Sequence, residues 1–99
     1  MFVVTGTLEL SLDADGRLRL PDWLATELRR SPFVLEAAQD ADGHPVLVGL
    51  PRTAAPDARL GVIDQQGRLA PPPEGFPGVA AEGKAVRLLG CGLYFILGR

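Results

Sequence analysis

One ten-residue pattern occurs twice in this chain, and its repetition is the strongest constraint on the fold. Residues 12–21 read LDADGRLRLP, and residues 63–72, which lie 51 positions later, read IDQQGRLAPP. Each copy has an apolar residue before Asp, two variable positions, Gly-Arg-Leu, and a proline three residues after the leucine. A short unit with one open apolar face cannot close a core alone, and a second copy in the same chain supplies the missing half. The repeat therefore predicts two similar units that build one core.

The first copy lies inside a predicted unit of strand, loop, strand, helix and hairpin. Residues 2–12 alternate apolar and polar side chains from Thr5 onward, and an Asp-Gly turn then leads into the alternating return strand RLRL. Residues 21–30 predict a short helix that begins with a proline and ends with two arginines. The strands FVLEAAQ and PVLVGL flank a second DADG turn at residues 40–43. Residues 1–50 thus form the expected first unit.

The second copy begins a shorter version of the same order after a connector at residues 51–57. In residues 58–99, RLGVI, the DQQG loop and RLA predict strand, loop and strand, and AVRLL and LYFIL predict a hairpin that turns at GCG. Residues 71–83 contain four prolines and three glycines, which leave room for one helical turn at best. We therefore expect a mainly β (β-rich α+β) protein. Its two units would form one intertwined, β-barrel-like domain over residues 1–99, with a pseudo-twofold and a degenerate second helix.

The composition fits a single folded domain. The chain has 99 residues, of which 46% are hydrophobic, enough for one modest core and too few for two. No apolar stretch approaches the ~20 residues that span a bilayer. The first ten residues alternate like a strand and lack the basic start and cleavage signal of a secretory peptide. The single cysteine, Cys91, cannot form an internal disulfide, so we expect a reduced, cytoplasmic protein without a membrane partner.

Charge is distributed unevenly between the halves. The formal net charge is −2; residues 1–50 carry four basic and eight acidic side chains, and residues 51–99 carry six basic and four acidic ones. Because phosphate contacts depend on Lys and Arg, a polyanion should prefer the second half. The first loop is expected to be net acidic around Arg17, and the second net basic around Arg68, with Arg59 near enough to add phosphate contacts.

No pattern in the sequence predicts an active site. His44 and Cys91 are the single histidine and cysteine, and together they cannot form a protein-only zinc site. Neither serine stands in a Gly-x-Ser-x-Gly elbow, and the acidic pairs in the turns lack the ligand spacing of a calcium loop. We therefore expect no enzyme, no metal site and no cofactor.

At the repeated motif the chain resembles the MraZ proteins, transcriptional regulators of the AbrB/MazE/SpoVT swapped-hairpin class. In that family a single chain holds two AbrB-like units, and each carries Asp-x-x-x-Arg in the loop that meets DNA. The resemblance covers roughly residues 5–50 and 58–98, and it assigns Asp13 and Arg17 to the first loop and Asp64 and Arg68 to the second. The chain departs from the family at Asp15, where a basic or neutral residue is common. The resemblance implies a bacterial DNA-binding regulator.

The motif suits the chemistry of reading double-stranded DNA. An arginine fork matches O6 and N7 of guanine in the major groove, and an aspartate four residues earlier can hold the loop or steer the guanidinium group. A glycine between them lets the backbone turn and approach closely. The expected DNA-binding residues are Asp13, Arg17, Arg19, Asp64, Arg68 and Arg59.

Two other functions stay open at this point. A protein-interaction or assembly module would keep the fold without binding DNA, which the acidic first half and the degenerate second unit favour. A MazE-like antitoxin is the third reading, but the second half ends in an apolar strand instead of a flexible tail. We also expect a homo-oligomer, built on a helix face that carries Trp23 and Leu24.

Overall fold

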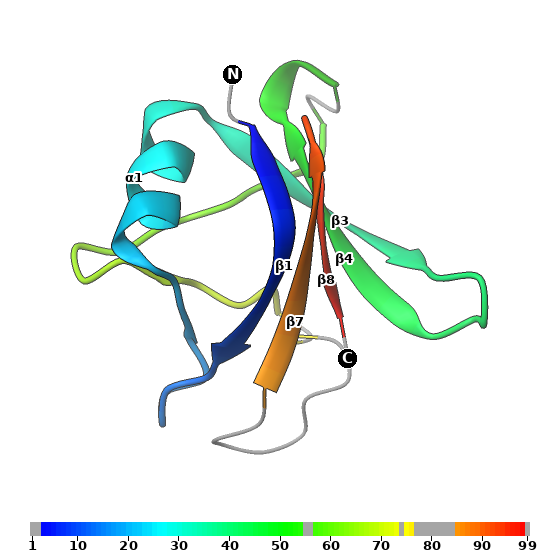
Figure 1. Ribbon diagram of the computed structural model, residues 1–99, viewed down its shortest axis with the longest axis horizontal. Helices are drawn as coiled ribbons and strands as arrows, with labels where there is room; N and C mark the ends of the chain where they lie inside the picture. The colour runs from blue at the N-terminus through cyan, green and yellow to red at the C-terminus, as the bar shows by residue number, and fades with distance from the viewer. Residues whose placement is uncertain (1–2, 55–56, 74, 77–84, 99) are drawn as a thin grey trace.

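The computed structural model describes residues 3–54, 57–73, 75–76 and 85–98, and it shows a mainly β protein with one short α-helix (Figure 1). The predicted β-rich class is therefore confirmed. In chain order the elements are β1 (Val4–Ser11), β2 (Leu18–Arg19), α1 (Asp22–Arg30), β3 (Phe33–Gln39), β4 (Pro45–Pro51), the 3-10 turn η1 (Arg52–Ala54), β5 (Arg59–Leu60), β6 (Arg68–Leu69), β7 (Ala85–Gly92) and β8 (Phe95–Gly98).

Six strands form one antiparallel sheet in the order β1-β7-β8-β4-β3-β5. Strands from the two halves of the chain are interleaved in it. β1 pairs with β7 of the second half, and β5 pairs with β3 of the first half. At the centre β4 pairs with β8, with Leu47 opposite Leu97 (Figure 1). The hairpin of each half is thus extended by the opening strand of the other, so neither half has a sheet of its own.

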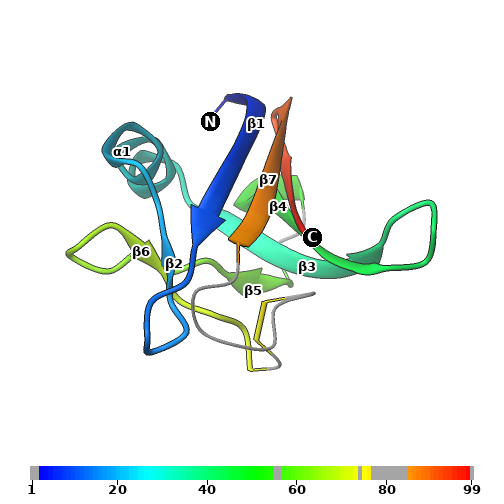
Figure 2. The same cartoon turned by 60° about the horizontal axis from the view of Figure 1, so that its bottom comes forward.

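The two copies of the repeated motif meet in a second, two-stranded sheet (Figure 2). β2 and β6 run antiparallel, with Leu18 opposite Leu69 and Arg19 opposite Arg68. Each copy also has a bridge from its first apolar residue to its leucine, Leu12 to Leu18 and Ile63 to Leu69. The return strands are shorter than the sequence predicts, and each is followed after one residue by a proline, Pro21 or Pro71, which has no N–H to continue a ladder.

The large sheet is open in the part of the chain that the structure describes. Its edge strands, β1 and β5, do not pair with each other there. The expectation of a barrel-like closure is wrong for these residues, and the length of β5 explains why. β5 has two residues and is followed by Gly61, where an added Cβ would lie 2.1 Å from the Phe33 ring. Gly61 still donates its N–H to the Phe33 carbonyl at 2.9 Å, with the Phe33 ring against it, and the described pairing of β5 with β3 ends there.

Helix α1 covers one side of the core and presents one face to it. Leu24, Ala25 and Leu28 are buried, at the spacing of a single helical stripe. Asp22 lies in the first turn and Arg29 and Arg30 in the last, the charge order that the helix dipole favours. We expected Trp23 and Leu24 to contribute to contacts between copies of the chain. Leu24 is fully buried and cannot do so, whereas Trp23 is 53% exposed and lies at the surface.

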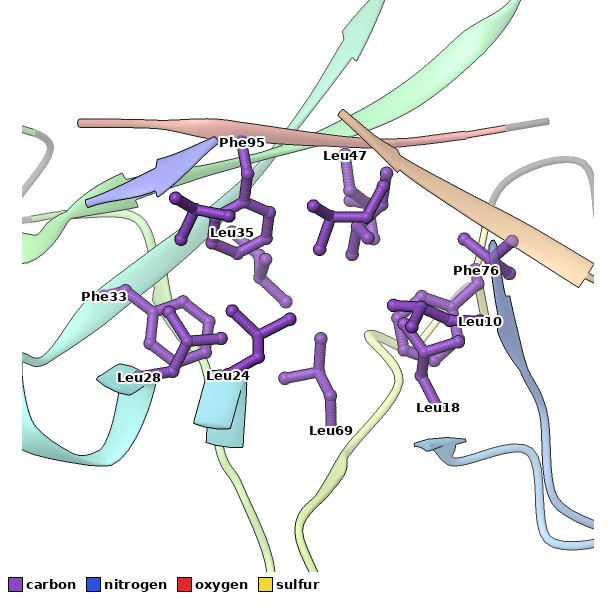
Figure 3. Packing of buried hydrophobic residues seen from close by; sticks show 14 residues of the cluster. Leu10, Leu18, Leu24, Leu28, Phe33, Leu35, Leu47, Leu69, Phe76 and Phe95 are labelled. Carbon is purple, nitrogen blue, oxygen red and sulfur yellow. The ribbon is translucent and has the colours of Figure 1, made fainter. Parts of the chain in front are cut away.

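The core is built by side chains from both halves. Leu18 and Leu69 of the small sheet and Leu24 of α1 point toward side chains of the large sheet such as Leu35 and Leu47 (Figure 3). The Phe33 and Phe95 rings lie 6.0 Å apart between centroids, at an interplanar angle of 55°. Burying these side chains together stabilises the interleaved arrangement, since neither half could cover them alone.

The turn of the last hairpin lies later than the sequence predicts. β7 runs through Gly90 and Cys91 to Gly92, and the turn falls at Leu93 and Tyr94, closed by a hydrogen bond from the Cys91 N–H to the Tyr94 carbonyl (2.9 Å). Gly90 serves a different purpose, because an added Cβ there would meet the Val4 backbone at 2.6 Å. The glycine allows β1 to approach closely.

We expected at most one helical turn between Pro71 and Gly83, and part of that segment lies outside the described residues. Within its described part, the Gly75 N–H donates to the Pro72 carbonyl and Phe76 is buried in the core. None of the described helices has the length and apolar character needed to cross a bilayer.

Candidate functional site

Three loops of the Asp-x-x-Gly type share one backbone geometry. At Asp13, Asp40 and Asp64, the aspartate N–H donates to the carbonyl four residues later at 2.8–2.9 Å, and the glycine N–H donates back to the aspartate carbonyl at 3.0–3.1 Å. The three glycines have φ between 79° and 82°, a conformation that favours glycine. The loop at Asp40 lies in an ordinary hairpin and ends in His44. The loop shape is therefore general, and the arginine at its end distinguishes the two repeated copies.

The small sheet brings the two repeated loops together so that each arginine reaches the aspartate of the other loop. Arg17 Nη1 lies 3.2 Å from Asp64 Oδ2, and Arg68 Nη1 lies 2.7 Å from Asp13 Oδ2. Arg19, opposite Arg68 in the strand pair, donates from Nε to Asp13 Oδ1. We call this group the arginine–aspartate cluster; its members are Asp13, Asp15, Arg17, Arg19, Asp64 and Arg68.

Within the cluster Arg68 is the most constrained arginine. Its Nε donates to Asp64 Oδ2 at 2.9 Å, and its Nη1 faces both Asp13 and Asp15. The Arg68 side chain is 25% exposed, against 38% for Arg17 and 71% for Arg19. The sequence placed the acidic residues of the first loop around Arg17, but antiparallel pairing of β2 and β6 turns two of them toward Arg68 as well. That part of the expectation is corrected.

The two motif aspartates do different work. Asp64 Oδ1 accepts hydrogen bonds from the N–H groups of Gln66 and Arg68, both at 2.9 Å, and so holds its own loop. The Asp13 side chain instead accepts from the side chains of Arg19 and Arg68, and it is only 9% exposed. Both aspartates therefore contact the arginine of the other loop, and Asp64 in addition holds the backbone of its own loop.

These hydrogen bonds lower the pKa of both carboxyls. For Asp13 the largest cause is the bond from the Arg68 side chain, followed by that from Arg19. For Asp64 the largest cause is the bond from the Arg68 backbone N–H. The Arg68 guanidinium pKa is raised in return, chiefly by Asp13. Both carboxylates and Arg68 therefore keep their charges near neutral pH.

The cluster has no formal net charge, because its three arginines match its three aspartates. Beside it lies a polar hollow of about 360 Å³, lined by Asp13, Arg19, Leu20, Gln66, Gly67 and Arg68. The amide of Gln66 and the arginine N–H groups give this hollow donors and an acceptor at the edge of the strand pair. Its chemistry suits a ligand that offers several hydrogen-bond acceptors.

The structure brings five of the six expected DNA-binding residues into one cluster. The sixth, Arg59, lies on β5 opposite Leu35 and makes no ion pair with any described residue. Two further contributors were not foreseen. Arg29, in the last turn of α1, donates from Nη2 to the Asp64 carbonyl, and Gln66 lines the hollow. The basic end of α1 was visible in the sequence, but its position beside the second loop follows from tertiary packing.

The hairpin loop at residues 40–44 also groups three potential metal ligands. Single ligand atoms of Asp40, Asp42 and His44 lie within 4.8 Å of one another, and all three residues are exposed. Asp40 Oδ1 is already used, since it accepts from the N–H groups of Asp42 and His44 at 2.9 Å. These hydrogen bonds account for the grouping as part of the turn.

Comparison of the chain with protein-family models, curated proteins and solved structures finds no match. The repeated motif and the geometry of the arginine–aspartate cluster are therefore the features of this chain that bear on its function.

Proposed function

We propose that this chain is a bacterial DNA-binding transcriptional regulator of MraZ/AbrB type, which contacts double-stranded DNA through the arginine–aspartate cluster. In this proposal residues 1–50 and 58–99 are two AbrB-like units of the swapped-hairpin class, related by a pseudo-twofold. The protein would act in the cytoplasm, as a homo-oligomer.

The observation that carries the proposal is the cross-pairing of Arg17 with Asp64 and of Arg68 with Asp13. It collects both copies of the motif at one surface, where two loops can meet one duplex. An aspartate that is hydrogen-bonded to one side of a guanidinium group fixes the arginine side chain in place. Less conformational entropy is then lost when the remaining N–H groups bind a base edge. The Nη2 groups of both arginines donate to no other described residue, which leaves them for a ligand.

The neutral charge of the cluster shapes the kind of binding expected. Non-specific affinity for DNA comes mainly from neutralised phosphates and falls steeply with salt. A cluster in which every arginine is matched by an aspartate supplies little of this term. We therefore expect weak non-specific binding and a larger share of the affinity from contacts to base edges.

The test is a fluorescence titration of labelled duplexes, selected for binding from a random pool, at two salt concentrations. If Arg68 reads a guanine, Arg68→Ala weakens binding to the selected sequence by about 5- to 150-fold. Arg68→Lys keeps the charge and loses the fork, so it should resemble Arg68→Ala on the selected duplex. The matched control is Arg87→Ala, which removes an exposed arginine on β7, opposite Glu9. Equal losses for Arg68→Ala and Arg87→Ala would contradict the proposal.

The same charge balance supports a second candidate, an assembly module that keeps the fold without binding DNA. In that case the Asp–Arg pairs serve to lock the two loops together, and exposed Trp23 contributes to contacts between copies. The titration separates the two functions. If no duplex in the pool binds at low salt, the assembly module takes the place of the regulator.

A further inference from the structure

Asp15 occupies an unusual position inside the cluster. Its Oδ2 atom lies 3.4 Å from Arg17 Nε and 3.3 Å from Arg68 Nη1, so one carboxylate oxygen faces the arginines of both repeated loops. Guanidinium N–H groups form charge-assisted hydrogen bonds with carboxylate and phosphate oxygens alike, so two of them directed at one anionic oxygen can also accept a phosphate oxygen there. We infer that Asp15 is an internal competitor for a phosphate group, and that a backbone phosphate of the duplex takes the place of its Oδ2 when DNA binds. The choice of DNA as the phosphate's source rests on the proposed function.

The three aspartates of the cluster differ in how firmly they are held. The side chain of Asp13 is 9% exposed and that of Asp64 is 18% exposed, whereas that of Asp15 is 49% exposed. The other two carboxylates each accept bonds near 2.9 Å or shorter, but the contacts of Asp15 are all 3.3 Å or longer. Exposed ion pairs at these distances contribute little to stability. Asp15 is thus the carboxylate that a ligand can displace while the other two keep the arginines in position.

Displacing Asp15 also completes the binding surface of both arginines. On the Arg68 side chain, the Nη1 donor that now faces Asp15 would become free for a phosphate oxygen, while Nε stays bonded to Asp64 and Nη1 to Asp13. The Nε donor of Arg17 would also become free, while Nη1 of Arg17 keeps its contact with Asp64. The cluster would then carry one net positive charge, centred between the two loops. An incoming phosphate therefore meets a preformed pair of donors that is masked in the free protein.

The chain itself supplies the variant that tests this inference. Gln66 takes the place of Asp15 in the second loop, so Asp15→Gln gives both loops the same residue without a new loop shape. Asp42 holds the corresponding position in the loop at residues 40–44, which has the same backbone hydrogen bonds and lies outside the cluster. Asp42→Gln is therefore a control with an identical change in charge. Asp15→Asn serves as a second variant, and thermal melting verifies that each protein is folded.

The measurement is an NMR titration of the Arg17 and Arg68 Nε–H signals with inorganic phosphate, followed by a titration with the selected duplex. Asp15→Gln is expected to bind phosphate about tenfold more tightly than wild type, because one opposing charge beside the donors is removed. Its affinity for DNA should rise, and its salt dependence should steepen by about one phosphate contact. Asp42→Gln should match wild type in both titrations.

The outcomes separate the two proposals. If Asp15→Gln and Asp15→Asn bind phosphate no better than wild type, the inference is wrong even where DNA binds. If Asp15→Gln gains phosphate binding but no variant binds DNA, the anion site stands and the DNA-binding function fails. A gain of equal size in Asp42→Gln would show a general effect of net charge and overturn the assignment to Asp15.

Discussion

The junction between the two halves can be tested by one added methyl group, in Gly49→Ala. Gly49 lies on β4 directly opposite Phe95 on β8, and the Phe95 ring covers it. An added Cβ would lie 2.1, 2.3 and 2.5 Å from three ring carbons, more than 1 Å inside normal contact. Overpacking costs about 1–3 kcal/mol, and the upper half applies because the ring is fully buried. Replacing glycine within a strand returns about 0.5–1 kcal/mol. The net loss is therefore about 1–2.5 kcal/mol, or roughly 4–20 °C in Tm.

Urea and thermal denaturation followed by circular dichroism measure this loss. The double variant Gly49→Ala/Phe95→Leu is the control, because a smaller side chain opposite the new methyl removes the collision. The free energy of unfolding that the double variant loses should be smaller than the sum of the losses of the two single variants. A Gly49→Ala protein as stable as wild type, or more stable, would refute the reasoning, because the ring would then not lie over Gly49.

Three other predictions concern pH, the core and assembly. Because the pKa values of Asp13 and Asp64 are lowered in the folded state, their ionised carboxylates stabilise the protein above the ordinary value of 3.8, and this stability is lost as the pH falls through the lowered values. The urea midpoint of wild type should therefore fall below about pH 4, and Asp13→Asn should show a smaller fall; identical pH profiles for the two proteins would contradict the ion pairs. Leu69→Ala should cost about 2–5 kcal/mol in urea denaturation, since Leu69 is 1% exposed, and a cost below about 1 kcal/mol would place it outside the core. Wild type should sediment above the 10.5 kDa monomer at high micromolar concentration and Trp23→Ala closer to it; a monomeric wild type would rule out the expected oligomer.

The elements of the fold that depend on local sequence were predictable. Asp-Gly turns fix the loops, a proline and two arginines mark the ends of α1, and alternating residues give the long strands. The exact length of β5 and the turn at Leu93 were not predictable. The length of β5 depends on its pairing with β3. Of the two glycines that flank Cys91, Gly90 lies within β7 against the Val4 backbone, and Gly92, with φ at 85°, leads into the turn.

The candidate site was predictable in its members and not in its pairings. The repeated motif identified Asp13, Arg17, Asp64 and Arg68, but it suggested that each aspartate serves the arginine of its own loop. Antiparallel pairing of β2 with β6 sets each loop opposite the other, so that Arg17 reaches Asp64, and Arg68 reaches Asp13 while it keeps its bond to Asp64. No local pattern encodes these contacts between the loops, and for the same reason the contribution of Arg29 could not be predicted from the sequence.

The most direct measurement of the central claim is a titration of the isotopically labelled protein with a selected duplex of about 20 base pairs at low salt. If the arginine–aspartate cluster is the surface that meets DNA, backbone amide signals of residues 13–19 and 64–68 should shift together and saturate at one affinity. Signals of the matching loop at residues 40–44 should stay in place, since that loop has the same shape and no arginine. A duplex that leaves both repeated loops unperturbed, or that shifts the loop at residues 40–44 equally, would contradict the account.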